Sequence, residues 1–464
     1  MVYSRKFTAD VGRGALSSWP KGVGEKERDC MKYVPTVREK DKAVIMAAVR
    51  RFGPVSQVGI HDLTRLRPAT ISMLVRELLA EGRLRVEGLA DNPKGRKQIL
   101  LHINEASGFV VAVDFDEEFV DVALVDLHPQ AKFSLRQPTE LWQGIDGLVQ
   151  QLFSCVRRLV RKSGVRWEDL RGIGMGVPGL VNSRDGMIIM SSTIEFWKQI
   201  PLQRLFQTEF GIPTVVENNA RTKAMAERVL GAGEMADDMI YAEYGKGIGA
   251  GIIAGGKVLH GHSFSAGEFG HTHILEDGPA CKCGSFGCLE AIAGIGALEA
   301  RIRKALAEGG ASRCLEMAGG DANSITGWMV LKAADLGDKL ARALVEDLGR
   351  SLGLGLANMV NLFNPSVIVL DYRLQAAGQP LLDQISRTVR LQALSHATAD
   401  LAFRFGKLGP RIGVLGAGLL VTERIFEVPL LKAPKFIIDR IATPASRSDP
   451  RPDPGSPMPP GPTT

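Results

Sequence analysis

The stretch FVVAVDFDEEFVDVALVDLHPQAKFSLRQ, residues 109–137, decides the fold class of this 464-residue chain. It holds three apolar runs, VVAVDF, FVDVALVDL and KFSLRQ, separated by short polar segments, which is the pattern of consecutive β-strands. Helical and strand patterns then alternate to about Phe426, and a second hairpin pattern, MIYAEYGKGIGAGIIAG at 239–255, opens a further unit. We therefore predict an α/β fold in two lobes. Other predicted elements are the helices Gly144–Ser163, Leu202–Phe210 and Ala220–Leu230 and the strands Gly172–Val177 and Pro213–Glu217.

Upstream of these strands, residues 40–103 show a pattern of three helices followed by a hairpin. Apolar residues recur at helical spacing over Ala43–Phe52, Ser56 is a good N-cap for a short second helix, and Pro68 suits the first turn of a third. The strands RLRVEG and QILLHI then enclose a basic loop. This order predicts a winged helix-turn-helix, although an ordinary helical subdomain would show the same helices.

Positive charge is concentrated at this end of the chain. The formal charge of the whole sequence is +6, but Met1–Ile103 contains 20 Lys and Arg against 11 Asp and Glu. Such a basic end favours a nucleic-acid partner, and we expect a homo-oligomer, a dimer or tetramer, to read operator DNA. The third helix would lie in the major groove, with the basic loop on phosphates or in the minor groove. The predicted DNA contacts are Arg67, Ala69, Thr70, Ser72, Met73, Arg76, Lys94, Arg96 and Lys97.

The composition is that of a globular protein without a membrane anchor. Hydrophobic residues make up 45% and charged residues 23%, and no apolar run approaches the roughly 20 residues that span a bilayer. The N-terminus lacks the apolar segment of a secretion signal, so we expect a cytoplasmic protein. Residues 1–39 and 440–464 are rich in Gly, Ser, Pro and charge without periodicity, and we predict that both are disordered tails.

Three of the six cysteines lie within eight residues of one another, which indicates a metal ion and not disulfide bonds. Cys281, Cys283 and Cys288 follow His271, and three thiolates with one imidazole fill the tetrahedral shell of Zn²⁺. Because no ligand position stays open for water, we predict a structural zinc site. His273 is a competing fourth ligand, and a chance cluster of buried thiols is the alternative interpretation.

Two glycine-rich segments, GIGMGVPG at 172–179 and YGKGIGAG at 244–251, carry a weaker signal. Neither matches the phosphate-binding P-loop or the dinucleotide-binding fingerprint. Glycine-rich hairpin turns explain both segments equally well.

Together these motifs resemble the ROK family (repressor, open reading frame, kinase), in particular its transcriptional regulators. The resemblance runs from about Val44 to Phe426 and rests on GIGMGVPGLVN, IPTVVENNA, GKGIGAGII, GEFGH, CKCGSFGCLE and IGVLGAG. It implies a sugar-kinase-like (actin-like) core of two ribonuclease-H-like lobes, with a sugar in the cleft and a zinc ion supporting the loop that holds it. The implied domains are a winged helix-turn-helix at 40–103, a first lobe at 104–217 completed by about 410–428, and a second lobe with the zinc loop at 218–409.

The resemblance also implies which residues meet the sugar. Carboxylates and amides suit adjacent hydroxyls, and a zinc ion on one nitrogen of His271 would turn its other nitrogen toward the sugar. The alternative for Glu268 and Glu290 is that they are solvated surface charges. Carried over to this sequence, the sugar-binding residues are Gly176, Gly179, Asn218, Asn219, Glu268, His271 and Glu290.

Three departures from the kinases of the family bear on function. The kinases carry Asp-x-Gly-Gly-Thr in the first hairpin turn, whereas here Asp114 precedes the acidic turn 116–118, which would repel a triphosphate. Their catalytic base is the Asp of Glu-Asn-Asp, where this chain has Asn219, an amide that takes up no proton from a hydroxyl. Asp371 stands where the kinases tend to have glycine.

These departures predict a sensor and not an enzyme. We expect a sugar-responsive transcriptional regulator, a repressor, that binds a small sugar or sugar phosphate and no ATP. The alternative is an active ATP-dependent sugar kinase with a fused DNA-binding domain, which Asn219 and the acidic turn disfavour. A sugar-insensitive architectural protein would require the pocket residues to be missing, and they are present.

Overall fold

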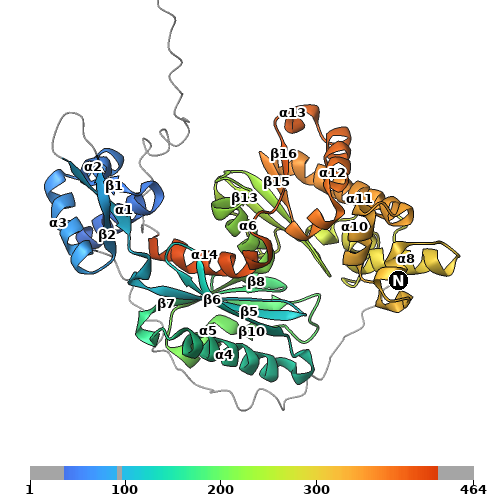
Figure 1. Ribbon diagram of the computed structural model, residues 1–464, viewed down its shortest axis with the longest axis horizontal. Coiled ribbons are helices and arrows are strands. Elements are labelled where there is room, and N and C mark those ends of the chain that lie inside the picture. The colour runs from blue at the N-terminus through green and yellow to red at the C-terminus, as the bar shows by residue number, and fades with distance from the viewer. Residues whose placement is uncertain (1–35, 91–96, 427–464) are drawn as a thin grey trace, which may run out of the picture.

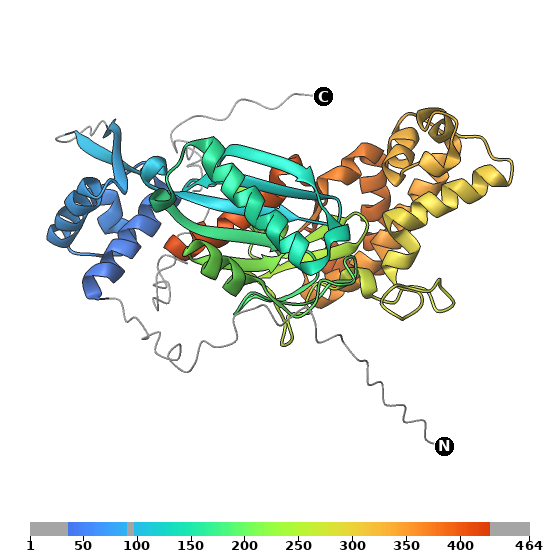
Figure 2. The same cartoon turned by 90° about the horizontal axis from the view of Figure 1, so that it is seen from below.

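Three parts of the molecule follow one another along its long axis in a computed structural model that describes residues 36–90 and 97–426. An N-terminal domain lies at one end, a first α/β lobe in the middle and a second lobe at the other end (Figures 1 and 2). None of the helices in these two ranges combines the length and the apolar character that a bilayer span requires. The tails predicted at 1–39 and 440–464 fall outside the described residues, except for 36–39.

The N-terminal domain consists of three helices and a three-stranded sheet of order β1-β3-β2. Helix α1 begins at Val37 and not at Ala43, because Thr36 and Glu39 form a capping box in which each side chain accepts from the other's backbone N–H. Residues 37–39 are therefore helical, which corrects the predicted extent of the N-terminal tail. The elements are α1 (Val37–Phe52), β1 (Val55–Ser56), α2 (Gln57–Thr64), α3 (Pro68–Ala80), β2 (Leu84–Ala90) and β3 (Gln98–Ile103).

The core of this domain is shared with the rest of the chain. Ile45, Val49 and Leu74 from its helices are fully buried. Leu127 from lobe 1 and Phe426 from the last helix belong to the same apolar cluster. Burial of these two side chains stabilises the attachment of the N-terminal domain to lobe 1, because it removes apolar surface of both parts from water.

Lobe 1 is built on a mixed sheet of order β11-β7-β4-β5-β6. Strands β4, β5 and β6 are antiparallel, while β7 and β11 continue the sheet in parallel on the other side of β4. The predicted bounds of α4 and α5 are confirmed. The elements are β4 (Phe109–Phe115), β5 (Phe119–Asp126), β6 (Ala131–Pro138), α4 (Gly144–Ser163), β7 (Leu170–Val177), β8 (Leu180–Asn182), β9 (Met187–Met190), β10 (Ile200–Pro201), α5 (Leu202–Phe210) and β11 (Thr214–Asn218).

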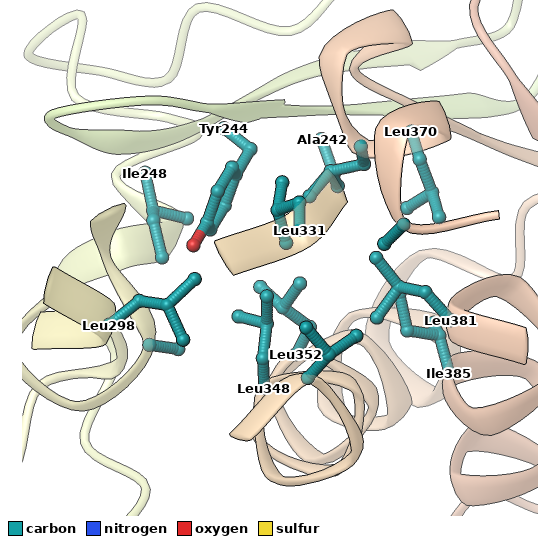
Figure 3. Close-up of a cluster of buried hydrophobic side chains, with 14 of the residues drawn as sticks. Ala242, Tyr244, Ile248, Leu298, Leu331, Leu348, Leu352, Leu370, Leu381 and Ile385 are labelled. Carbon is teal, nitrogen blue, oxygen red and sulfur yellow. The ribbon is translucent and has the colours of Figure 1, made fainter. Parts of the chain in front are cut away.

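Lobe 2 repeats this plan with a sheet of order β14-β13-β12-β15-β16. An antiparallel β12–β13–β14 meander is again continued by two parallel strands, which confirms the prediction of two ribonuclease-H-like lobes. Figure 3 shows apolar side chains of the sheet, such as Tyr244 and Leu370, pointing toward Leu331, Leu348 and Leu381 of the covering helices. The elements are α6 (Asn219–Leu230), β12 (Met239–Tyr244), β13 (Ile248–Ala254), β14 (Lys257–Val258), α7 (Leu289–Ala293), α8 (Ile295–Ala307), α9 (Arg313–Met317), α10 (Gly327–Asp335), α11 (Lys339–Phe363), β15 (Val367–Leu370), α12 (Gln379–Gln392), α13 (Ser395–Thr398) and β16 (Ala402–Phe405).

The last described helix, α14 (Ile412–Phe426), returns to lobe 1 and lies across its sheet beside α6 (Figure 1). Glycines permit this close approach. A Cβ atom on Gly174 of β7 would lie 1.9 Å from the carbonyl oxygen of Ala417, and one on Gly416 would lie 2.2 Å from that of Thr222. The segment 172–179 therefore begins as a strand packed against a helix, and its glycines up to Gly174 serve this packing instead of a hairpin turn.

Candidate functional site

A cavity of about 390 Å³ lies between the two lobes. The predicted sugar-binding residues that line it are Gly179, Asn218, Asn219, Glu268, His271 and Glu290. Gly176 does not line this cavity. It is buried within β7, which lies between β4 and β11. This part of the site prediction is corrected: the alternation of the strand turns Gly176 toward Asp114 and Thr222 below the cavity.

Glu217, near the end of β11, is buried directly before Asn218 of the cavity lining. Its Oε1 accepts a hydrogen bond from the backbone N–H of Asn218 at 2.7 Å, and its Oε2 lies 2.7 Å from both Ser183 Oγ and His260 Nε2. Burial alone would raise the pKa of this carboxyl, but the hydrogen bond with His260 and the charge of Arg221 outweigh burial and lower the pKa. Glu217 is therefore a buried carboxylate that holds Ser183, His260 and Arg221 in place.

Asn218 is held by two hydrogen bonds. Its Oδ1 accepts from the backbone N–H of Arg221 at 3.2 Å, which makes Asn218 the N-cap of α6. Its Nδ2 donates to the carbonyl oxygen of Gly179 at 3.0 Å. These bonds fix the amide at the edge of the cavity, since both of its polar atoms are already oriented by the backbone.

Arg221 links Glu217 to the loop that carries Glu268. Its side chain is 2% exposed, and Nη1 donates to Glu217 at 3.1 Å. Nη2 donates to the carbonyl oxygens of Phe264 and Ala266, at 2.5 and 3.0 Å. The sequence offered no role for this arginine, the third residue of α6. The structure shows that it holds the backbone of the loop 259–268, which carries Glu268 and is called the sugar loop below.

The carboxylates predicted to hold the sugar face the cavity. Glu290, on α7, accepts from the backbone N–H of Ile248 at 2.9 Å through Oε2. Burial raises the pKa of Glu268 from its ordinary value, with the charge of His271 opposing this effect. Carboxylate oxygens in such a partly enclosed cavity can accept hydrogen bonds from several hydroxyls of one small polyol.

The four predicted metal ligands come together below this loop. Ligand atoms of His271, Cys281, Cys283 and Cys288 all lie within 4.8 Å of one another, so the cluster could hold a metal ion. Nδ1 of His271 lies 3.7 Å from Cys281 Sγ, while its Nε2 lies 3.9 Å from Glu268 Oε2. The imidazole therefore has one nitrogen toward the cysteines and the other toward the cavity.

His273, the competing ligand, lies outside this cluster. Its Nδ1 is 2.9 Å from the carbonyl oxygen of Phe286, and the ring is exposed. The chain turns back toward the cluster at Gly284 and Gly287, whose φ angles are +90° and +66°. Both values lie in the region that favours glycine, as the spacing of the motif requires.

The cavity lining also includes charged pairs that the sequence analysis missed. Lys223 of α6 forms an ion pair with Glu243 of β12, and both are nearly buried. Arg373 binds Asp371 with two hydrogen bonds, at 2.9 and 2.8 Å. A charge inside the otherwise apolar strand MIYAEY was the one signal available, because a buried strand seldom carries an unpaired carboxylate.

Helix α3 presents most of its predicted DNA-contacting residues to solvent. Arg67, Ala69, Met73 and Arg76 are exposed, whereas Thr70 and Ser72 are half-buried. The Ser72 hydroxyl donates to Gln57 Oε1 at 2.8 Å, so it also joins α3 to α2. Lys97 is exposed at the start of β3, and the predicted contacts Lys94 and Arg96 lie outside the described residues.

Comparisons with known proteins agree with this architecture. A family model described as ROK family matches residues 111–424. The chain is 27% identical over 393 residues to a protein named xylose repressor from Caldicellulosiruptor bescii, which covers 85% of this chain and 98% of that protein.

Two solved structures are similar to different shares of the chain. One is a ROK family transcriptional regulator described as a homologue of the Escherichia coli MLC protein, with a TM-score of 0.74, 24% identity, and coverage of 87% of this chain and 99% of that chain. The other is a ROK family glucokinase from Streptomyces griseus in complex with glucose and AMPPNP, with a TM-score of 0.61, 29% identity, and coverage of 68% and 99%. The regulator fold thus extends over more of this chain than the kinase fold does.

Proposed function

Because the chain belongs to the ROK family, we propose that it is a sugar-responsive transcriptional repressor: the kinase-like core senses a small sugar, and the N-terminal domain binds operator DNA. The observation that carries this proposal is the placement of α14. Its first turn packs against Asp114 of β4, two residues before the acidic turn 116–118, and its last residue, Phe426, belongs to the core of the N-terminal domain. The similarity to a xylose repressor over 98% of that protein supports the same function.

The contacts at the far end of α14 are specific as well as apolar. Arg50 of α1 pairs with Glu423 at 2.5 Å, donates to the carbonyl oxygen of Thr422 at 3.3 Å, and lies over the ring of Phe426. At the near end, a Cβ atom on Gly413 would collide with the Asp114 carboxylate. A sugar that changes the angle between the lobes would displace α14, and with it the N-terminal domain.

We propose that the core does not transfer phosphate. Asn219, at the place of the kinases' base, uses its Oδ1 to accept from the backbone N–H of Ala220 at 3.0 Å. The turn 116–118 places three carboxylates at the cavity wall. Kinase activity remains the second candidate because the glucokinase structure is similar over two thirds of the chain. An assay with glucose and ATP separates the two functions.

Zinc is the metal that best suits the cluster of His271 and three cysteines. Thiolates with one imidazole are a closed donor set for Zn²⁺, which in such sites stabilises a loop instead of activating water. Here the loop carries Glu268, and His271 belongs both to the cluster and to the cavity lining. We propose that the metal orders the sugar loop.

For DNA recognition we propose that α3 enters the major groove. Arg76 of α3 and Arg67, the residue directly before the helix, are exposed cations, and an arginine that reads a guanine contributes about 1–3 kcal/mol of discrimination. Arg76→Ala should therefore weaken operator binding and relax specificity at one position, whereas Arg161→Ala, on the exposed face of α4, should leave binding unchanged. Gel-shift titrations at several salt concentrations would measure both effects.

A second copy of the chain would supply the other DNA-binding domain. Three leucines at the end of α11, the end of α12 and the turn after α12 are strongly exposed: Leu362 at 76%, and Leu391 and Leu394 at 70% each. They lie close together, since the backbone N–H of Leu394 donates to the side chain of Asn361 at 2.9 Å. We propose this face as the dimer contact. Leu391→Lys should shift sedimentation toward a monomer, which would be contradicted by an unchanged mass.

The proposed function is tested by linkage. An operator selected from random duplexes is titrated with and without xylose, glucose and N-acetylglucosamine. We expect one of these sugars to lower operator affinity by about 5- to 150-fold, and the operator to lower affinity for that sugar by the same factor. Arg50→Ala should reduce this factor toward one while sugar affinity persists. The control is Arg424→Ala, an exposed arginine of α14 beside Glu423, the residue that Arg50 pairs with. Equal operator affinities with every sugar would refute the proposal.

A further inference from the structure

The charges around the cavity say what kind of sugar it can hold, if the proposed function is correct. Seven carboxylates line the cavity, against three side chains of Lys and Arg. A phosphate ester carries close to two negative charges at neutral pH, so it needs an uncommitted cation or a cradle of backbone amides. Each of the three cations is already bound to a carboxylate.

Lys223 and Arg373 are committed inside the protein. Lys223 is 8% exposed and pairs with Glu243. Burial alone would lower the pKa of its ammonium group, but the charges of Glu243 and Asp114 outweigh burial and raise the pKa, so Lys223 stays charged within a neutralised pair. Arg373 is bound in a bidentate way to Asp371, which is 1% exposed. Neither cation can turn to a ligand without leaving a buried carboxylate unpaired.

The third cation, Lys246, is committed across the cleft. It lies at the tip of the β12–β13 hairpin and pairs at 3.0 Å with Glu118, at the tip of the equivalent β4–β5 hairpin of lobe 1. Both side chains are about half exposed, so this pair is the one that a ligand could compete for. The remaining lining carboxylates include Glu117, Glu268 and Glu290. They attract hydroxyl donors and repel phosphate.

We propose that the cavity selects an unphosphorylated sugar against its phosphate esters, and that the Glu118–Lys246 pair between the two hairpin tips is a specificity-determining contact. The pair keeps Lys246 from serving as a phosphate ligand. The Lys223–Glu243 and Arg373–Asp371 pairs occupy the same side of the cavity with charges that are internally balanced. Recognition then rests on carboxylate and amide oxygens, which suit neutral hydroxyls.

The experiment measures binding to the full-length protein by calorimetry for glucose, N-acetylglucosamine, mannose and xylose, each beside its terminal phosphate ester. The parent sugar that binds should do so at least tenfold more tightly than its ester. Glu118→Gln frees Lys246. The ratio of sugar affinity to ester affinity should then fall by threefold or more, mainly because the ester binds more tightly. Glu168→Gln, an exposed carboxylate of lobe 1 outside the cavity, has the same change in charge and should keep the wild-type ratio.

The results distinguish this proposal from the proposed function. An ester that binds as tightly as its parent sugar would overturn the selectivity while leaving the sensor intact. A ratio that is the same in Glu118→Gln and in the wild type would overturn the role of the pair. If operator DNA binds but no sugar or ester does, the proposed sensor fails, and the selectivity fails with it.

Discussion

The two sides of the cleft use charged residues in opposite ways. On the sugar side, Glu268 and Glu290 present oxygens to the cavity, and Arg221 holds the backbone of the loop that carries Glu268. On the other side, Lys223 and Glu243 neutralise each other. The carboxylates of Glu268 and Glu290 are available to a ligand, whereas Lys223 and Glu243 are occupied by each other. Under the proposed function, sugar binding depends on the first group of side chains, and the second group occupies the place where a phosphate would have to bind.

The largest effect should come from breaking the metal cluster on the sugar side. Cys283→Ser should reduce bound zinc from one ion per chain to nearly none and abolish sugar binding, since the metal site and the sugar loop share His271. Metal analysis and calorimetry on the purified protein measure both. His273→Ala, outside the cluster, should retain the metal. Stoichiometric zinc in Cys283→Ser would show that the ligand set is wrong.

A smaller loss should follow from neutralising one carboxylate of the sugar side. Glu268→Gln should weaken sugar binding by about 10- to 100-fold, because a hydrogen bond to a charged group contributes about 1.5–3 kcal/mol and 1.4 kcal/mol is tenfold. Calorimetry measures the change. Glu276→Gln, an exposed residue of the same loop region that does not line the cavity, is the matched control. Equal losses of sugar affinity in the two variants would mean that the net charge of the loop weakens binding, and not the loss of a direct hydrogen bond from Glu268.

Asp114, a buried carboxyl near the Lys223–Glu243 pair, should make the stability of the protein depend on pH. Burial raises the pKa of Asp114 to about 7, against the opposing charge of Lys223 and together with the carboxylates of Asp116, Glu243 and Asp121. In the unfolded chain this carboxyl ionises near pH 4. The stability that Asp114 contributes is therefore complete below about pH 4 and is lost as the pH rises to about 7.

Asp114→Asn removes this titration. Between pH 5 and pH 8 the wild type should lose about 2 kcal/mol relative to the variant, because one pKa unit corresponds to about 1.4 kcal/mol. Thermal melts of both proteins at the two pH values give the difference, which should amount to several degrees. If the melting temperature changes equally in the two proteins between pH 5 and pH 8, Asp114 stays ionised over this range, held by Lys223.

The last substitution should have no effect on kinase activity. Asn219→Asp restores the carboxylate at the place of the kinases' base, yet a coupled assay with glucose and ATP should stay at background. The acidic turn 116–118 and the Lys223–Glu243 pair would still exclude a nucleotide phosphate from that side. If Asn219→Asp turns over glucose and ATP, and the added change Glu268→Gln abolishes that turnover, then residue 219 alone accounts for the missing kinase activity.

Local patterns in the sequence determined much of this protein. The helices α4 and α5 were predictable residue by residue because amphipathic periodicity reports which face of a helix is buried. The cluster of candidate metal ligands was predictable because its donor chemistry and spacing are specific, and the structure brings the same four side chains together. The start of α1 at Val37 was also visible in principle, as the capping pair Thr36 and Glu39 stands in the sequence.

Only the tertiary structure decided which distant residues are partners. Glu243 meets Lys223 across two elements, Lys246 meets Glu118 across two lobes, and Arg50 meets Glu423 almost at the other end of the chain. Periodicity relates a residue to neighbours two to four positions away, so it carries no information on such pairs. Whether a charge is a free ligand or one half of a buried pair depends on what the packing of the sheets places beside it, and that distinction separates the two sides of this cleft.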